Sequence, residues 1–202
     1  MTEGCAAGKR AATYVRSPSS VICQCSVLRP PMPIRPAQPS DLAVITAIYD
    51  DAVRHGTASF ELDPPDQAEM ARRYETLRAG GYPYLVAELD GDIVGYAYAG
   101  PYRARPAYRW SVEDSIYIAP QVQRRGIGGA LLARLLSEAE AGGFRQMLAV
   151  IGDTANIGSV ELHRAAGFRL VGTFENVGFK FGRWLDTVLM QRELGRGATI
   201  GP

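Results

Sequence analysis

The stretch from Val112 to Leu132 limits the folds open to this chain more than any other part of the sequence. It begins as an alternating strand and runs through the glycine loop Gln123-Arg-Arg-Gly-Ile-Gly128 directly into an amphipathic helix. Glycines let the backbone turn tightly, and the first N–H groups of a helix have no partner within the helix. Together with the positive end of the helix, these donors form a site for an anion such as a pyrophosphate. Arg124 and Arg125 supply positive charge at its rim.

Spacing excludes two other phosphate-binding motifs. A dinucleotide fingerprint requires a third small residue three positions after the second glycine, where this chain has Leu131. A P-loop requires Gly-Lys followed by Ser or Thr, and the chain contains no such run. The glycines alone leave two interpretations open, namely another kind of anion site or a glycine turn without a ligand.

The periodicity of apolar residues predicts one domain over residues 32–194 with the element order β-α-α-β-β-β-α-β-α-β-β. The first strand starts at Ile34, Ser40 caps the first helix, and Asp66-x-x-Glu69 begins the second in the manner of a capping box. Because the order is not a regular βαβ alternation, the fold class is α+β with a mixed sheet. The remaining expected elements are strands 84–89, 93–99, 112–118, 147–151, 168–174 and 184–194, and helices 126–141 and 156–166.

The two ends of the chain differ from this domain. Residues 1–31 are rich in Ala, Ser, Arg and Pro, contain one acidic residue, Glu3, and lack periodicity, so we expect a disordered extension. Their composition resembles a transit peptide and equally fits an upstream start codon. All three cysteines, Cys5, Cys23 and Cys25, lie there, which favours a reducing, cytoplasmic setting. Residues 195–202 are expected to form a glycine-rich tail.

Charge and composition argue against several classes of partner. The formal net charge is +1, which provides no overall field for nucleic acid or an anionic membrane. No apolar run reaches the roughly 18 residues of a membrane span. Cys23-x-Cys25 lacks a second Cys/His pair at usable spacing, so no metal site is expected.

The glycine loop and several distant motifs resemble the GNAT superfamily of acetyltransferases. Gln123-x-x-Gly126-x-Gly128 is similar to the coenzyme A pyrophosphate loop of these enzymes, and Asn156-x-x-Ser159-x-x-Leu162-His163-x-x-x-Gly167-Phe168 is similar to their next helix. Segments 95–118, 149–152 and 178–184 resemble the group that acetylates phosphinothricin and methionine sulfoximine. The likeness covers about residues 33–193. It implies a GNAT-type mixed, mostly antiparallel central sheet with a splayed parallel strand pair, flanked by helices.

The resemblance also implies acetyl-CoA as co-substrate. Backbone groups of the strand are expected along the pantetheine arm, N–H groups of the loop at the pyrophosphate, and Asn156 at the coenzyme from the next helix. The expected coenzyme-binding residues are Ile116, Tyr117, Ile118, Gln123, Arg124, Arg125, Gly126, Ile127, Gly128, Gly129 and Asn156.

Acetyl transfer requires a neutral amine, and an aliphatic α-ammonium group titrates between about 8 and 10, so a base can contribute about 10²–10⁴-fold. By its place in the motif Glu113 is the expected catalytic base; the alternative is an edge-strand glutamate that faces solvent. His163 falls where many members of the family have a tyrosine that protonates the departing thiolate. Its imidazole suits proton transfer in either direction. With no cysteine in the domain, direct attack is favoured over an acyl-enzyme.

Substrate recognition is expected from the loop before the catalytic strand. Guanidinium groups bind carboxylates in a bidentate manner, so Arg103 and Arg105, with Tyr108, suit an amino-acid substrate; a solvated basic loop is the alternative. Glu61 is more like the methionine-sulfoximine branch than the phosphinothricin branch, which has Arg there. The resemblance further implies a homodimer in which both subunits border the site. The expected substrate-binding residues are Phe60, Glu61, Arg103, Arg105, Tyr108, Asp114 and Ser115.

The predicted function is therefore acetyl transfer to the amino group of a small amino-acid-like substrate, and other interpretations stay open. A GNAT enzyme acting on a protein N-terminus or a lysine would show an open, often acidic peptide groove. A non-catalytic acyl-CoA-binding module would have lost its catalytic groups, yet Glu113 and His163 are both present. A nucleic-acid binder using Arg124 and Arg125 is disfavoured by the near-neutral net charge.

Overall fold

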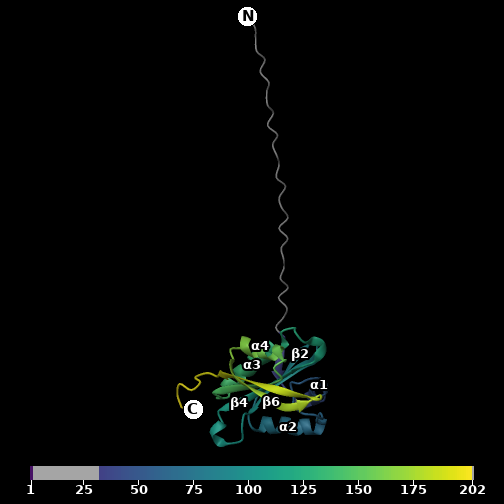
Figure 1. The fold of residues 1–202 in the computed structure, drawn as a ribbon, viewed down its shortest axis with the longest axis vertical. Helices are drawn as coiled ribbons and strands as arrows, with labels where there is room; N and C mark the ends of the chain where they lie inside the picture. Colours follow the sequence, from purple (N-terminus) through teal and green to yellow (C-terminus); the bar gives the residue numbers. More distant parts are fainter. Residues whose placement is uncertain (2–31, 202) are drawn as a thin grey trace. The chain divides into compact units, whose positions relative to one another are not determined.

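The computed structural model describes Met1 and residues 32–201, so the expectations for the N-terminal extension and its cysteines lie outside the described residues. The folded part is a seven-stranded sheet covered by four α-helices (Figure 1). Their order along the chain is the predicted one. The elements are β1 (Ile34–Pro36), α1 (Leu42–His55), α2 (Gln67–Ala79), β2 (Tyr84–Leu89), β3 (Asp92–Pro101), β4 (Ser111–Ile118), α3 (Ile127–Ala141), β5 (Gln146–Gly152), α4 (Ile157–Ala165), β6 (Arg169–Lys180) and β7 (Arg183–Glu193).

One parallel strand pair interrupts an otherwise antiparallel sheet. The strands follow the order β1-β2-β3-β4-β5-β7-β6, and only β4 and β5 run parallel. Residues Ser111–Glu113 of β4 pair with Gln146–Leu148 of β5, and the pairing ends there. Beyond Glu113 and Leu148 the two strands continue without hydrogen bonds to each other. We call this divergence the fork. The α+β class with a splayed parallel pair is thereby confirmed.

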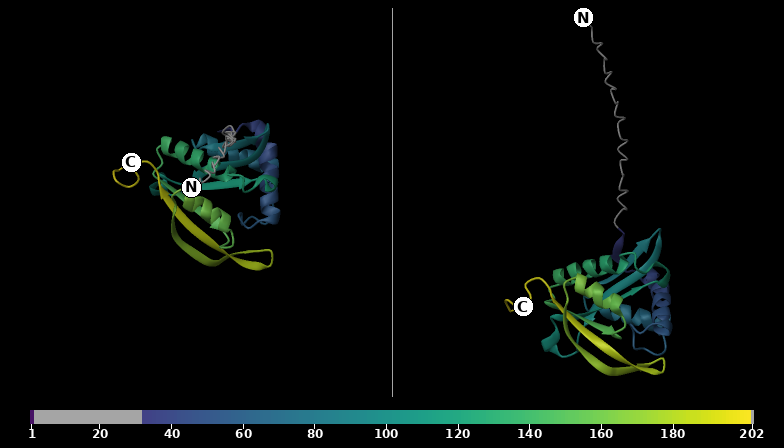
Figure 2. Two further views of the ribbon diagram at one scale, coloured as in Figure 1. Left: turned by 90° about the horizontal axis from the view of Figure 1, so that it is seen from above. Right: turned by 45° about the horizontal axis from the view of Figure 1, so that its top comes forward.

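The helices divide between the two faces of the sheet (Figures 1 and 2). On one face, Tyr49 of α1 packs its ring against Tyr117 of β4, with ring centroids 5.0 Å apart. On the other face, a Cβ added at Gly95 of β3 would meet Leu131 of α3, while Gly128 lies against Leu162 of α4. Each residue of β4 therefore points either toward α1 or toward α3 and α4, because strand side chains alternate. Among the described residues no helix is both long and apolar enough to cross a membrane.

Two local predictions were wrong. Ser40 does not cap the first helix; Pro39–Asp41 forms a 3₁₀ turn in which Asp41 accepts a hydrogen bond from the Gln38 N–H at 2.7 Å. The strand expected to end at Phe174 continues to Lys180 and forms one long hairpin with β7, drawn in yellow in Figure 2. A shift in register between Phe174 and Gly178 breaks the alternation there, which concealed the strand from the sequence pattern.

Candidate active site

Two adjoining hollows meet at the fork. Named after the roles expected from the sequence, the smaller, of about 330 Å³, is termed the acceptor cavity, and the larger, of about 1060 Å³, the coenzyme groove. The two share lining residues, so they form one continuous surface from the helix side of the sheet into the fork. The shared residues are Ala58, Ile116, Tyr117, Asn156 and Ser159.

The coenzyme groove ends at the N-terminus of α3. Gly126 precedes the helix with a φ of +84°, a conformation that glycine adopts without strain. The first helical hydrogen bond runs from the Ala130 N–H to the Gly126 carbonyl, so three N–H groups lie ahead of it, those of Ile127, Gly128 and Gly129. Donors at a helix N-terminus suit an anion.

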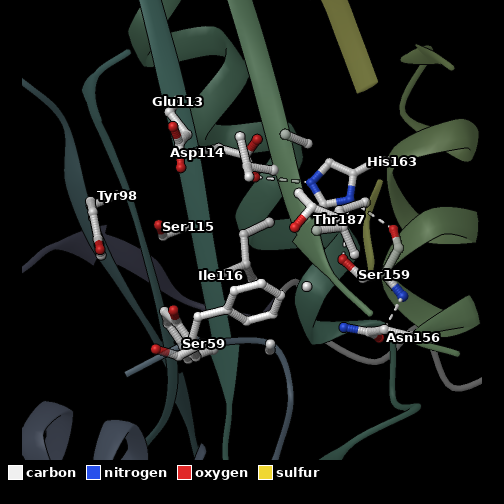
Figure 3. A pocket seen from close by; sticks show the side chains of 17 residues that line it. Ser59, Tyr98, Glu113, Asp114, Ser115, Ile116, Asn156, Ser159, His163 and Thr187 are labelled. Carbon is white, nitrogen blue, oxygen red and sulfur yellow. Dashed lines mark hydrogen bonds and ion pairs between the residues drawn. The ribbon is translucent and has the colours of Figure 1, made fainter. Parts of the chain in front are cut away.

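The N-terminus of α4 lies on the opposite wall of the groove. Asn156 caps this helix, its Oδ1 accepting from the Ser159 N–H at 3.3 Å. Its side chain is thus held at the point where groove and cavity meet (Figure 3). A Cβ added at Gly128 would lie 3.3 Å from Leu162, so a small residue at this position lets α3 and α4 approach closely.

Glu113 lies in the acceptor cavity on the α1 side of β4, together with Ser115 of the same strand and Tyr98 of β3 (Figure 3). Its pKa is raised to about 7, mainly by burial and also by the negative charge of Asp114, while the positive charge of Arg103 opposes the rise. A carboxylate with a pKa near the working pH is suited to act as a general base.

Asp114 and His163 form a buried pair that joins β4 to α4 across the fork. His163 Nε2 lies 2.9 Å from Asp114 Oδ2, and His163 Nδ1 lies 2.7 Å from the Ser159 carbonyl oxygen. Because a carbonyl only accepts, Nδ1 carries a proton. Burial lowers the pKa of His163, but the hydrogen bond and charge of Asp114 outweigh burial and leave this pKa raised. Both ring nitrogens are therefore engaged.

The second oxygen of the Asp114 carboxylate, Oδ1, is buried and has no hydrogen-bond partner within the described part of the chain. Asp114 also lines the acceptor cavity. An unpaired buried acceptor is costly, so a ligand or water in the cavity that donated to Oδ1 would be stabilised.

Comparison with known proteins agrees with this geometry. Residues 34–189 match the family described as an acetyltransferase (GNAT) domain. The chain belongs to the GNAT acetyltransferase family. It is 51% identical over 180 residues to a phosphinothricin N-acetyltransferase of Alcaligenes faecalis, covering 89% of this chain and 88% of that one. It is 40% identical to an L-methionine sulfoximine/L-methionine sulfone acetyltransferase of Salmonella typhimurium, covering 83% and 97%.

A solved structure shows the same fold. The crystal structure of a GNAT phosphinothricin acetyltransferase from Sinorhizobium meliloti in complex with AcCoA superposes with a TM-score of 0.83 at 50% identity, covering 85% of this chain and 92% of that one. The family membership and enzyme class expected from the sequence are therefore confirmed.

Most of the residues expected at a GNAT site come together at the two hollows. Glu113, His163, Phe60, Asp114 and Ser115 line the acceptor cavity. The coenzyme groove is lined by Ile116, Tyr117, Ile118, Gln123, Arg124, Gly126, Ile127, Gly128, Gly129 and Asn156.

Five of the expected residues lie elsewhere. Arg125 is exposed and does not line the groove. Glu61 does not line the acceptor cavity; its carboxylate accepts hydrogen bonds from the Tyr49 hydroxyl and the Arg73 guanidinium. The other three, Arg103, Arg105 and Tyr108, are exposed on the loop before β4. Arg103 stacks on the ring of Tyr102, at 5.0 Å from the centroid. Arg103 of this loop nevertheless influences the site, because its positive charge lowers the pKa of Glu113.

Sequence reasoning missed several lining residues. Tyr98 was within reach of a pattern argument, because it lies opposite Ser115 in the β3–β4 register and faces the same side as Glu113. Ser59 and Thr187 carried no local signal, since they come from a loop and from β7, far away in sequence.

Proposed function

We propose that this chain transfers the acetyl group of acetyl-CoA to the amino group of a small amino-acid-like substrate by direct attack. The observation that carries this proposal is the meeting of the coenzyme groove and the acceptor cavity at the fork, with Glu113 in the lining of the acceptor cavity. The relatives named above support the substrate class, of the methionine sulfoximine/sulfone or phosphinothricin type.

The chain's own residues perform the following steps. N–H groups of the loop and of the first turn of α3 hold the pyrophosphate, with Arg124 and Arg125 adding positive charge. Backbone groups of Ile116–Ile118 align the pantetheine arm along β4. When bound, acetyl-CoA supplies an activated acetyl thioester. Glu113 accepts a proton from the incoming amine, directly or through one water molecule, and its raised pKa keeps it basic enough for this step. The amine nitrogen forms the new C–N bond at the thioester carbonyl, the C–S bond breaks, and coenzyme A leaves as a thiolate that takes up a proton, so amide and thiol are the products.

In this proposal His163 acts through Asp114. Both ring nitrogens of His163 are engaged, so the imidazole holds Asp114 in place, while Asp114 Oδ1 is buried without a hydrogen-bond partner in the described part of the chain. An ammonium or amine N–H is the natural donor to such an oxygen. His163 is thus a positioning residue for the acceptor cavity, and any proton it supplies passes through Asp114.

The size and charge of the site support a small substrate. A cavity of about 330 Å³ is at the small end of ligand sites, which suits an amino acid better than an extended peptide. Its carboxylates, Glu113 and Asp114, attract the amino end. We assign the substrate carboxylate to the exposed loop before β4, which carries Arg103, Arg105 and Tyr108, because guanidinium groups suit a carboxylate and the charge of Arg103 acts on Glu113.

A thiol-release assay tests the function. The protein is incubated with acetyl-CoA and one of several amines: methionine sulfoximine, methionine sulfone, phosphinothricin, plain amino acids, polyamines or a basic peptide. Turnover is expected with the amino-acid analogues alone. Glu113→Gln is expected to lower kcat about 10²–10⁴-fold, as for the loss of a general base. Glu75→Gln, an exposed position on α2, is the matched control.

Each other outcome favours a different function. Turnover on the basic peptide alone would point to a protein N-terminus or a lysine as substrate. Binding of acetyl-CoA without thiol release from any amine would contradict the enzyme proposal and favour a binding module.

A homodimer and a cytoplasmic location complete the proposal. The β6–β7 hairpin carries apolar side chains that are half or more exposed, and patches of this kind mark interaction surfaces. β6 is also an edge strand with a free ladder of backbone groups, which a second copy of the same strand complements. The cytoplasm follows from the placement of all cysteines in residues 1–31. The exposed apolar residues of the hairpin and its turn are Leu170, Val171, Phe174, Val177, Phe179, Phe181 and Trp184.

A further inference from the structure

The segment Gly178–Trp184 is a sequence motif that the proposed chemistry does not use. It forms the end of β6, a tight turn, and the start of β7. Gly178 and Lys180 face inward, whereas Phe179 between them is 56% exposed. The inward side of this hairpin end lies against the loop after α1, which contributes Ala58, Ser59 and Phe60 to the acceptor cavity.

Lys180 binds that loop directly. Its side chain is buried, and Nζ donates to the Ser59 carbonyl at 2.8 Å and to the Gly56 carbonyl at 3.0 Å. Burial lowers the pKa of Lys180. A buried ammonium is costly unless it is hydrogen-bonded, so these two contacts compensate for its burial and tie together segments more than 120 residues apart.

Two glycines, Gly178 and Gly152, allow the loop to pack closely against the sheet. A Cβ added at Gly178 would lie 2.4 Å from a ring atom of Phe60. A Cβ added at Gly152, at the end of β5, would lie 2.2 Å from the Thr57 carbonyl oxygen and 2.9 Å from the Phe60 ring. Real side chains do not approach this closely, so any larger residue at either position would displace Phe60.

The loop needs such support because residues 56–60 form no helix or strand of their own. We infer that the end of the β6–β7 hairpin positions residues 56–60, which form one wall of the acceptor cavity. Lys180 is a positioning residue for this loop, and Gly178 determines amine specificity because it leaves room for the Phe60 ring. This inference rests on the proposed function, since it concerns the acceptor side of the same site. It also explains how a partner bound to the outer face of the hairpin would stabilise the cavity wall.

A matched pair of glycine variants tests the inference. Gly178→Ala pushes on Phe60, whereas Gly172→Ala, on the same strand, has no atom within 4 Å of the new Cβ. Gly178→Ala is expected to raise the KM for the amine about tenfold, because a displacement near 1 Å has large effects on a positioned substrate. The KM for acetyl-CoA is expected to change less than about twofold, and Gly172→Ala to leave both constants unchanged.

Rescue shows whether Phe60 transmits the effect. In a Phe60→Leu background the smaller side chain relieves the clash, so adding Gly178→Ala is expected to change the KM for the amine less than about twofold further. Non-additivity of this kind shows that the two residues are coupled, as expected from the close approach of Gly178 to the Phe60 ring. Additive effects would contradict the seating of Phe60.

Lys180→Met removes the two hydrogen bonds but keeps an apolar stem, and Arg169→Met removes a positive charge from the opposite, exposed end of the same strand. The Lys180 variant is expected to raise the KM for the amine and to speed hydrogen–deuterium exchange in residues 56–60, with exchange in α3 unchanged. The Arg169 variant is expected to do neither.

Folded Gly178 and Lys180 variants with a wild-type KM for the amine and wild-type exchange in residues 56–60 would overturn the inference. If Lys180→Met does not fold, the glycine pair and its rescue still decide. Failure of the proposed function has a different signature: wild-type protein would show no turnover with any amine, whereas exchange in residues 56–60 would still respond to Lys180→Met.

Discussion

At the scale of single residues, the adjacent Glu113 and Asp114 show how one strand supplies two kinds of carboxylate. Because side chains alternate, Glu113 faces the α1 side of the sheet while Asp114 faces α4 and pairs with His163. The charge of Asp114 nevertheless acts on its neighbour and helps to raise the pKa of Glu113. The two carboxylates therefore form one electrostatic unit at the fork.

The pH dependence of turnover reports on this unit. Glu113 must be deprotonated to act as a base, so log kcat/KM is expected to rise with pH and to level off above a pKa of about 7. We call the rising part of this pH profile its acid limb. Asp114→Asn removes a negative charge and is expected to move the acid limb to lower pH. Arg103→Gln removes a positive charge and is expected to move it to higher pH.

Opposite shifts are the decisive feature of this prediction. The position of the limb is measured rather than its height, because Arg103 also serves substrate binding in the proposed site. His163, which is paired with Asp114, is a second titrating group near the cavity, so the profile is repeated with His163→Gln. Shifts of the same sign in the Asp114 and Arg103 variants would contradict the assignment of the limb to Glu113.

At the scale of elements, the N-terminus of α3 is the part of the site whose action is clearest from local structure alone. Its unpaired N–H groups exist because a helix begins there, and the glycines keep side chains away from them. Ile116, Tyr117 and Ile118 of β4 and the cap of α4 also line the groove that ends at this terminus.

Charge at this helix terminus provides a direct test. Gly129→Asp places a carboxylate in the first turn of α3, and Gly129→Asn is its neutral counterpart of the same shape. The new Cβ would lie in ordinary contact, 3.9 Å from Leu162. The Asp variant is expected to raise the KM for acetyl-CoA about tenfold above the Asn variant, because it repels the pyrophosphate, with a smaller gap at high salt.

Stability separates this effect from damage to the fold. A negative charge at a helix N-terminus is favourable by about 0.3–1 kcal/mol, so the Asp variant is expected to melt no lower than the Asn variant. Equal KM values for acetyl-CoA in the two variants would contradict an anion site at α3.

At the scale of the whole molecule, the end of the β6–β7 hairpin turns Gly178 and Lys180 inward, whereas its outer side exposes apolar residues. The inner side holds the wall of the acceptor cavity through Lys180. The outer side exposes aromatic residues, among them Phe179 and Trp184, whose rings lie 5.3 Å apart. A second copy on the outer side would bury these rings.

The assembly state is therefore predicted to depend on the hairpin. Light scattering is expected to give twice the mass of the chain for the wild type and one chain mass for Phe179→Glu combined with Trp184→Glu. Leu62→Glu, at an apolar residue that is 67% exposed outside the hairpin, is expected to leave the dimer intact. A wild-type mass of one chain at micromolar concentration would contradict the dimer.

Part of this protein is determined by its sequence alone, because the relevant physics is local. The order of helices and strands follows from apolar periodicity, and the proposed anion site from glycines next to a helix start. The family motifs add the place of Glu113 in the strand that lines the two hollows. For these features the nearest neighbours in sequence supply the deciding interactions.

The remaining features were decided only in the tertiary structure, because they join residues that no local pattern relates. The pairing of β4 with β5 stops after three residues, which opens the fork and selects the residues that line it. The partner of His163 lies 49 residues away, and the carbonyls bound by Lys180 lie more than 120 residues away. Loop residues such as Glu61 take their direction from distant packing: Glu61 accepts a hydrogen bond from Arg73 of α2, whereas its neighbours Ser59 and Phe60 line the cavity.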